Sequence, residues 1–159
     1  MEMHHKISQH GFSMSYPDGF HVMEEEETRQ LKFLGNGEGI CLSDPDRHMM
    51  VSIGWKQIWG IVSLLLGTKD LAKDMEKRIR QPMKQYGYRK GESLKKKIGK
   101  KEAMGFSYEY SVQGTGMTGE SYVVKDGKEI YYLHVYMRTG LKSGSYPVWE
   151  GMLESISWE

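Results

Sequence analysis

The chain has 159 residues, of which 38% are hydrophobic and 27% charged, and its formal net charge is +1. This composition is ordinary for a soluble globular protein. The net charge is too small to favour nucleic acid or acidic partners by itself. The single cysteine, Cys41, excludes an internal disulfide framework and fits a reducing compartment. We expect residues 1–159 to form one domain, because a chain of this length can bury a sizeable core.

Residues 1–10 are mostly polar and contain no apolar stretch of the kind found in signal peptides. They predict a flexible terminus and a cytoplasmic protein. The longest apolar run, residues 58–66, has about half of the roughly twenty residues that a membrane helix needs. The sequence therefore predicts no membrane span.

The first part of the chain has the pattern of short strands. Apolar and polar side chains alternate over residues 12–16, 29–34 and 48–55, with shorter pieces at 20–23 and 40–42. Turn-forming residues separate these segments, which is typical of antiparallel pairing.

The middle of the chain changes to helical periodicity. Residues 57–66 are apolar on nearly all sides and predict a short helix. A second helix should be capped by Thr68, and Pro82, which has no amide proton, should kink or end it near Gln81. Its apolar side chains recur three or four positions apart, at Ala72, Met75, Ile79 and Met83. Residues 93–98 then predict a strand.

Residues 102–138 give the strongest pattern, three long strands joined by turns at 114–119 and at Asp126 and Gly127. The third strand carries bulky side chains at odd and even positions, so both of its faces should be covered. Residues 148–156 predict a closing helix. Together these elements indicate an α+β fold, an antiparallel sheet sandwiched between helices.

Motifs along nearly the whole chain resemble those of the PsbP-like superfamily. The opening motif F-x-x-x-YP-x-GF comprises Phe12, Tyr16, Pro17, Gly19 and Phe20. Later motifs are G-F-x-Y-x-Y, G-x-x-Y-V-V and I-Y-Y-L in residues 102–138, and VW-x-x-M-L-x-S-I over residues 148–156. The resemblance implies an antiparallel sheet between helices and a binding protein, as most members are, many of them bacterial. It supplies no catalytic residue, because the family has no common catalytic motif.

Two sequence features resemble ligand-binding motifs but are better explained without a ligand. The glycine-rich residues 35–39 join two predicted strands and lack the Lys-Ser/Thr of a phosphate-binding loop. His4, His5 and His10 have no fourth metal ligand at a recognisable spacing, so we expect them to be solvated. We therefore assign no metal and no cofactor.

One histidine lies inside the third of the long strands. His134 falls between Tyr132 and Tyr136 on one face, where it could act as a general base near neutral pH. Glu109, on a neighbouring predicted strand, is the acid that could orient it. We prefer a structural role for His134, because no nucleophile or substrate site accompanies it in sequence.

A basic run predicts a charged hairpin and comprises Lys95, Lys96, Lys97, Lys100 and Lys101. Such a run can bind an acidic partner, but it lacks the interleaved aromatic residues of a nucleic-acid surface. We prefer a solvated hairpin, whose lysines would also prevent edge-to-edge pairing of sheets.

The apolar residues 58–66 carry the most weight for function. Either they are buried in the sandwich, or one apolar side is left for a partner. We expect burial, because soluble monomers seldom leave such patches open. In the second case the residues that contact a partner are Trp59, Val62, Leu65 and Leu66.

The leading hypothesis is a non-enzymatic binding or adaptor module that recognises a protein or an apolar peptide segment through residues 58–66 and the basic hairpin. A second hypothesis is a small-molecule-binding protein or weak enzyme with a pocket near His134. A third is a structural domain that forms a homodimer through residues 58–66.

Overall fold

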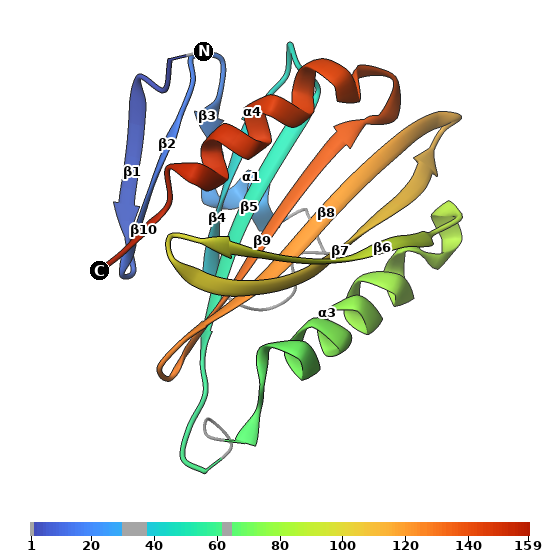
Figure 1. Ribbon diagram of the computed structural model, residues 1–159. Coiled ribbons are helices and arrows are strands. Elements are labelled where there is room, and N and C mark those ends of the chain that lie inside the picture. Colours follow the sequence, from blue (N-terminus) through green and yellow to red (C-terminus); the bar gives the residue numbers. More distant parts are fainter. Residues whose placement is uncertain (1, 30–37, 62–64) are drawn as a thin grey trace.

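Two antiparallel sheets organise the structure. The computed structural model describes residues 2–29, 38–61 and 65–159. In these residues the larger sheet has seven strands in the spatial order β3-β4-β5-β9-β8-β7-β6 (Figure 1). Along the chain they are β3 (His21–Val22), β4 (Glu38–Asp44), β5 (Met49–Gln57), β6 (Arg89–Ile98), β7 (Lys101–Val112), β8 (Thr115–Asp126) and β9 (Glu129–Arg138). The smaller sheet, in the order β1-β2-β10, comprises His5–Gln9, Phe12–Tyr16 and Ser157–Trp158.

The predicted meander forms β7, β8 and β9, which pair in sequence with β9 near the middle of the sheet. The first turn is shorter than predicted, because Thr115 already belongs to β8. Gln113 and Gly114 have φ angles of 50° and 82°, so two left-handed residues complete the reversal. Residues 115–119, predicted as part of the turn, are therefore strand.

Helices cover both faces of the larger sheet, which confirms the predicted α+β fold. On one face α3 (Thr68–Met83) buries Leu71, Met75, Ile79 and Met83 against aromatic and branched side chains of the meander. On the other face α4 (Lys142–Glu154) buries Val148, Trp149, Met152 and Leu153. Odd-numbered side chains of β9 belong to the α4 core and even-numbered ones to the α3 core, as its double-sided pattern predicts.

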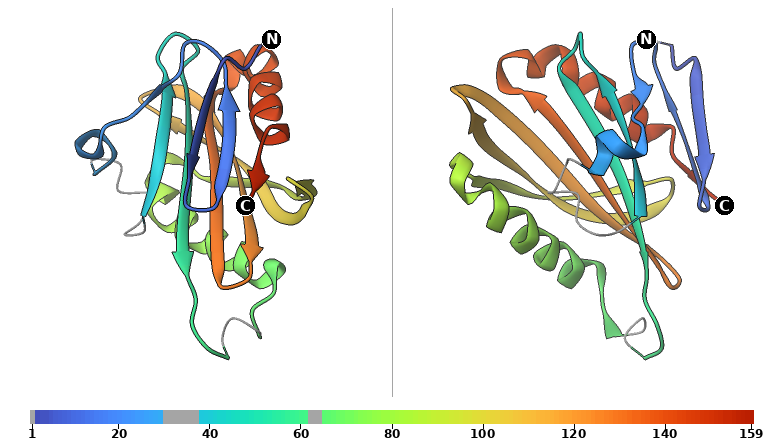
Figure 2. Two further views of the ribbon diagram at one scale, coloured as in Figure 1. Left: turned by 90° about the vertical axis from the view of Figure 1, so that its left-hand side faces the viewer. Right: turned by 180° about the vertical axis from the view of Figure 1, so that it is seen from behind.

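The N-terminal residues are not the flexible terminus that we expected. Residues 5–9 form β1, paired with β2 from His5 opposite Tyr16 to Gln9 opposite Phe12. The Tyr131 hydroxyl donates to the His10 carbonyl at 2.6 Å, which ties the hairpin to β9. Figure 2 shows β1 and β2 beside α4, where β2 buries Phe12 and Met14 in the α4 core. The apolar side of β2 therefore fixes this terminus.

Several predicted elements differ from the structure, among them the closing helix predicted over residues 148–156, since α4 begins at Lys142 and ends at Glu154. Arg29, expected to begin a strand, ends the short helix α1 (Glu25–Arg29), whose acidic first turn suits the helix dipole; the remaining residues of that predicted strand, 30–34, lie outside the described residues. The cap of α3 is Gly67, with Thr68 as the first helical residue. The predicted helix over residues 57–66 is wrong at its start, because Gln57 ends β5.

The described helices also bear on the membrane prediction. None of them combines the length and the apolar character that crossing a membrane requires.

A candidate docking site at the apolar tip

Three large apolar side chains are exposed together in the connection between β5 and α3. The exposed fractions are 70% for Trp59, 72% for Ile61 and 74% for Leu65. We call these three residues the apolar tip. In Figure 1 the described residues of this connection lie at the bottom, beyond the end of the β8–β9 hairpin. The tip therefore projects from the end of the sheet.

Buried and hydrogen-bonded residues on both sides hold the tip in place. Ile58, only 7% exposed, belongs to the α3 core, and its amide donates to the Lys128 carbonyl at 2.8 Å. On the other side the Lys125 ammonium donates to the Leu66 carbonyl at 3.0 Å. The Leu65 amide donates to the Ile61 carbonyl at 3.2 Å, which brings these two tip residues into one turn. The base of the tip is thus fixed while its side chains face outward.

The expectation that residues 58–66 are buried is wrong for most of the described ones. Only Ile58 lies in the core, because β5 ends one residue earlier and the chain then leaves the sheet. Gly60 has φ of 63°, a left-handed conformation that breaks a helical path. Leu66 is half-buried, and Val62 lies outside the described residues. A role of these residues in binding stays a prediction.

The predicted basic surface is divided between the two faces of the sheet. Lys96 lies over the Tyr122 ring, 5.7 Å from its centroid, on the α4 face, and its neighbours Lys95 and Lys97 have the opposite parity on β6. Lys101 pairs with Asp126 at 2.8 Å, and Lys100 is exposed in the turn. The run therefore does not form one continuous patch.

His134 is held in a row of polar side chains across the α3 face. Its Nδ1 lies 2.6 Å from the Ser121 hydroxyl, which is also 3.2 Å from the hydroxyl of Tyr108. Burial lowers the pKa of His134 to about 4, so the imidazole is neutral at neutral pH. On its other side, in register, lies Ser52, whose buried hydroxyl has no partner among the described residues.

The residues of the predicted His134 pocket do not converge. Glu109 pairs across the sheet with Thr118, on the α4 face, and forms an ion pair with Arg89 at 3.1 Å. It cannot orient His134 from there, so this assignment is wrong. Tyr136 lines an open cavity of about 260 Å³ that does not include His134 in its lining. Tyr132 is half-buried beside the α3 core.

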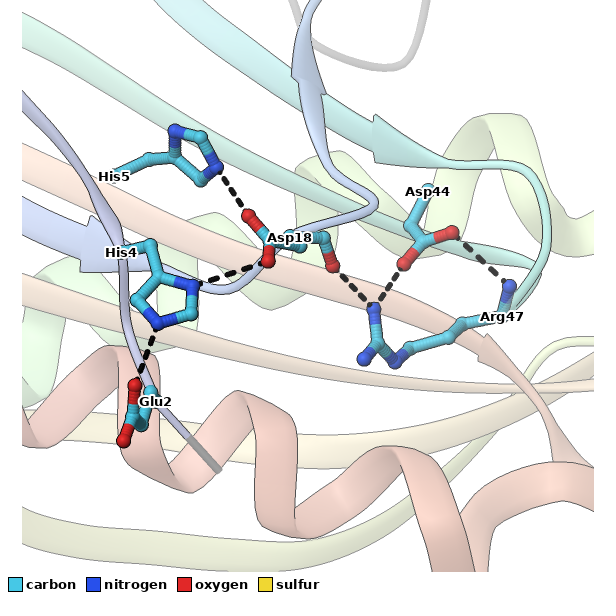
Figure 3. Close-up of polar contacts among 6 residues, drawn as sticks. All are labelled: Glu2, His4, His5, Asp18, Asp44 and Arg47. Atoms are coloured by element: carbon cyan, nitrogen blue, oxygen red, sulfur yellow. Dashed lines mark hydrogen bonds and ion pairs between the residues drawn. The ribbon is translucent and has the colours of Figure 1, made fainter.

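The N-terminal histidines form surface ion pairs instead of a ligand set (Figure 3). Asp18 lies between two of them, with Oδ1 2.6 Å from His5 Nε2 and Oδ2 3.0 Å from His4 Nδ1. Hydrogen bonds to Glu2 and Asp18 raise the pKa of His4, and those to the histidines lower the pKa of Asp18. His10 lies elsewhere, stacked on Trp55. In the described parts of the chain no three such side chains are arranged to hold a metal.

A second contact in Figure 3 fixes the turn between β4 and β5. The Arg47 guanidinium donates to the Asp44 carboxylate and to the Asp18 carbonyl, and the other Asp44 oxygen accepts the Arg47 amide. Asp44 is thus committed to its own turn.

The lysines on either side of the tip could not be identified from the sequence alone. Lys125 and Lys128 contact its base from the β8–β9 hairpin, and exposed Lys56 and Lys69 flank it along the chain. Their grouping depends on pairing between distant strands, since β9 pairs with β5. No local motif records such a grouping.

No protein-family model and no curated protein matches this chain. Similar solved structures exist. The solution structure of cyanobacterial PsbP (CyanoP) from Synechocystis has a TM-score of 0.73 at 10% identity, covering 98% of this chain and 92% of that one. A crystal structure from Bacteroides thetaiotaomicron has a TM-score of 0.62 at 19% identity, covering 99% of this chain and 49% of that one.

A third similar structure is LpqN, involved in cell envelope biogenesis of Mycobacterium tuberculosis. Its TM-score is 0.61 at 12% identity, and the match covers 96% of this chain and 90% of that one. Identities this low describe the fold alone. The chain has a PsbP-like fold.

Proposed function

We propose that this protein is a non-catalytic binding module that docks through its apolar tip. The observation that carries the proposal is the exposure of Trp59, Ile61 and Leu65, each at least 70%, on one projecting connection. Leaving such side chains in water is unfavourable, and a partner that covers them recovers about 25 cal/mol per Å² of apolar area. Exposed apolar patches on soluble proteins commonly mark interaction sites.

The shape of the tip defines how it would bind. The tip projects from the sheet, so its side chains enter a partner, whereas a receptor for an apolar peptide needs a groove. The leading hypothesis was a module that binds an apolar segment of its partner. We now propose that this protein itself supplies the apolar segment, which inserts into the partner. What supports binding over catalysis is that His134 is neutral and bonded to Ser121, with Glu109 on the other face.

Site-specific cross-linking tests this proposal. A photoreactive residue replaces Ile61 in one protein and Leu141 in a control; Leu141 is 43% exposed and follows β9 at the opposite end of the strands. In a native extract that retains its membranes, we expect a reproducible adduct from position 61 only. Excess wild-type protein should suppress this adduct.

The competitor that distinguishes docking from adhesion is a polar-tip variant with Trp59→Ser, Ile61→Ser and Leu65→Ser. It should not suppress the adduct, and its free energy of unfolding should stay within about 0.5 kcal/mol per substitution, because the three side chains are exposed. A matched variant, Val112→Ser with Leu141→Ser, should compete like wild type. Equal competition by the polar-tip variant, or no adduct, would contradict the proposed function.

A further inference from the structure

The apolar tip is bordered by positive charge on both sides. The Lys128 backbone accepts the Ile58 amide, and the Lys125 ammonium lies 3.0 Å from the Leu66 carbonyl, so both lysines belong to the base of the tip. Lys56 and Lys69 are exposed, three residues before Trp59 and four residues after Leu65. Among the described residues, no acid forms an ion pair with Lys56, Lys69 or Lys128.

The nearby acids leave this charge in excess. Asp126 is paired with Lys101 at 2.8 Å, and Glu129 lies 3.1 Å from the His10 ring. Asp70, exposed in the first turn of α3, offsets one lysine. The rim of the tip is therefore basic, although the whole chain has a formal net charge of only +1.

We infer that the partner of the apolar tip is an anionic lipid surface, an inference that rests on the proposed function. The exposed side chains would enter the boundary between headgroups and acyl chains, where tryptophan is favourable. The lysines would then lie at the level of the phosphates. Either signal alone gives marginal binding, and stable association takes an apolar element together with a basic patch.

Area and shape favour a bilayer over a protein partner. Each side of a standard protein interface buries about 800 Å², far more than three side chains can supply. A bilayer sets no such requirement, because it deforms around whatever enters it. A second copy of this chain is disfavoured as well, because two tips in contact would bring their lysines together, and like charges repel.

Vesicle binding by the intact chain tests the inference. Wild type, the polar-tip variant and a triple variant Lys56→Gln, Lys69→Gln and Lys128→Gln are sedimented with phosphatidylcholine vesicles, with and without phosphatidylglycerol. We expect wild type to bind only the anionic vesicles and the emission of Trp59 to shift to the blue. The partition coefficient should fall about fivefold for each lysine removed and about tenfold or more for the polar tip.

A charge-matched control separates local from overall electrostatics. Lys6→Gln, Lys84→Gln and Lys142→Gln remove the same charge from β1, from the 3₁₀ turn that follows α3 and from the start of α4. This variant should bind like wild type. Equal losses in the two lysine variants, equal binding to neutral vesicles, or undiminished binding of the polar-tip variant would each overturn the lipid inference.

The two proposals fail in different ways. If position 61 forms tip-dependent adducts with a protein while no anionic vesicle binds, the lipid inference is wrong and the docking function stands. Light scattering could instead show a wild-type dimer that the polar-tip variant does not form. That result would also contradict the lipid inference and support the docking function. If neither adducts nor vesicle binding occur, both are wrong.

Discussion

At the scale of single residues, His134 and its neighbours show how the sheet accommodates polar groups next to a core. The imidazole accepts or donates one bond to Ser121 at 2.6 Å, and the Tyr136 ring stacks against it at 6.2 Å between centroids. Ser52, on the other side, offers a hydroxyl that no described residue satisfies. Burial disfavours the charge that protonation would add to the ring, and Glu109 faces the other way.

This arrangement predicts a dependence of stability on pH. Burial lowers the pKa of His134 from 6.5 to about 4 in the folded state, so the unfolded chain binds more protons between these values. The contribution of His134 to the free energy of unfolding is fully present above pH 6.5. It decreases by about 1–3 kcal/mol as the pH falls toward 4. Denaturation of wild type and His134→Gln across this range should show a shallower decline in the variant. Parallel declines would contradict the assignment.

At the scale of elements, one buried carboxylate connects α4 to the sheet. Glu120 of β8 is 5% exposed and accepts hydrogen bonds from the Tyr146 hydroxyl at 2.8 Å and from Trp149 Nε1 at 3.1 Å. Burial raises the pKa of Tyr146. The hydrogen bond to Glu120 raises it further, because an ionised Tyr146 would face the Glu120 carboxylate. Both helical donors depend on this single side chain.

Replacing that carboxylate should therefore weaken the packing of α4. Glu120→Ala leaves two donors without an acceptor and should lower the free energy of unfolding by about 1–3 kcal/mol for each donor that stays buried. Glu154→Ala, at the exposed end of the same helix, should change it by less than about 0.5 kcal/mol. Urea denaturation of the two variants makes the comparison, and similar values for both would disprove the role of Glu120.

Sequence periodicity predicts the elements that pair with the next strand in sequence or that bury one regular side. The meander and the stripe Met75, Ile79 and Met83 were predictable because alternation and helical spacing directly record which side is buried. The strands β1 and β10 were missed because each is short and depends on β2, at a distance the local pattern does not report. The segment at Trp59 was misassigned because an apolar run does not show whether a core lies opposite it.

At the scale of the whole molecule, the large sheet separates two cores of unequal size. The core beneath α4 also includes β2 and side chains of β4, β5 and β9, whereas the α3 core rests chiefly on the meander. The chain enters α3 through the exposed tip and leaves it through a short 3₁₀ turn, Lys84–Tyr86. We expect α3 to be the less firmly held helix.

Native-state hydrogen exchange measures this difference. Amides of α3 should exchange through partial openings, at lower free energies than amides of α4 and β9. Substituting the exposed Trp59 should leave this order unchanged, since it does not belong to the core. If α3 amides exchange only through global unfolding, the two cores act as one cooperative unit.

Only part of the candidate site can be predicted from the sequence, because contacts between residues far apart in the chain leave no local pattern. Trp59, Leu65 and Leu66 attracted attention in the sequence by their composition alone, whereas the rim depends on the β8–β9 hairpin lying beside the end of β5. Lys125 and Lys128 are 60 to 69 residues along the chain from the nearest and farthest tip residues, so no local sequence pattern links them to the tip. The basic run at Lys95–Lys101 was more conspicuous, but strand alternation divides it between two faces.

The position of the only cysteine makes its rate of chemical modification a measure of how often the sheet opens. Cys41 lies within β4 and is 1% exposed, so a thiol reagent must wait until that strand opens. The rate at which the native chain consumes such a reagent therefore counts openings of the sheet. A second thiol placed by Ile61→Cys, at a position 72% exposed, would react without waiting, so a polarity-sensitive dye could be attached at the tip while Cys41 stays unlabelled.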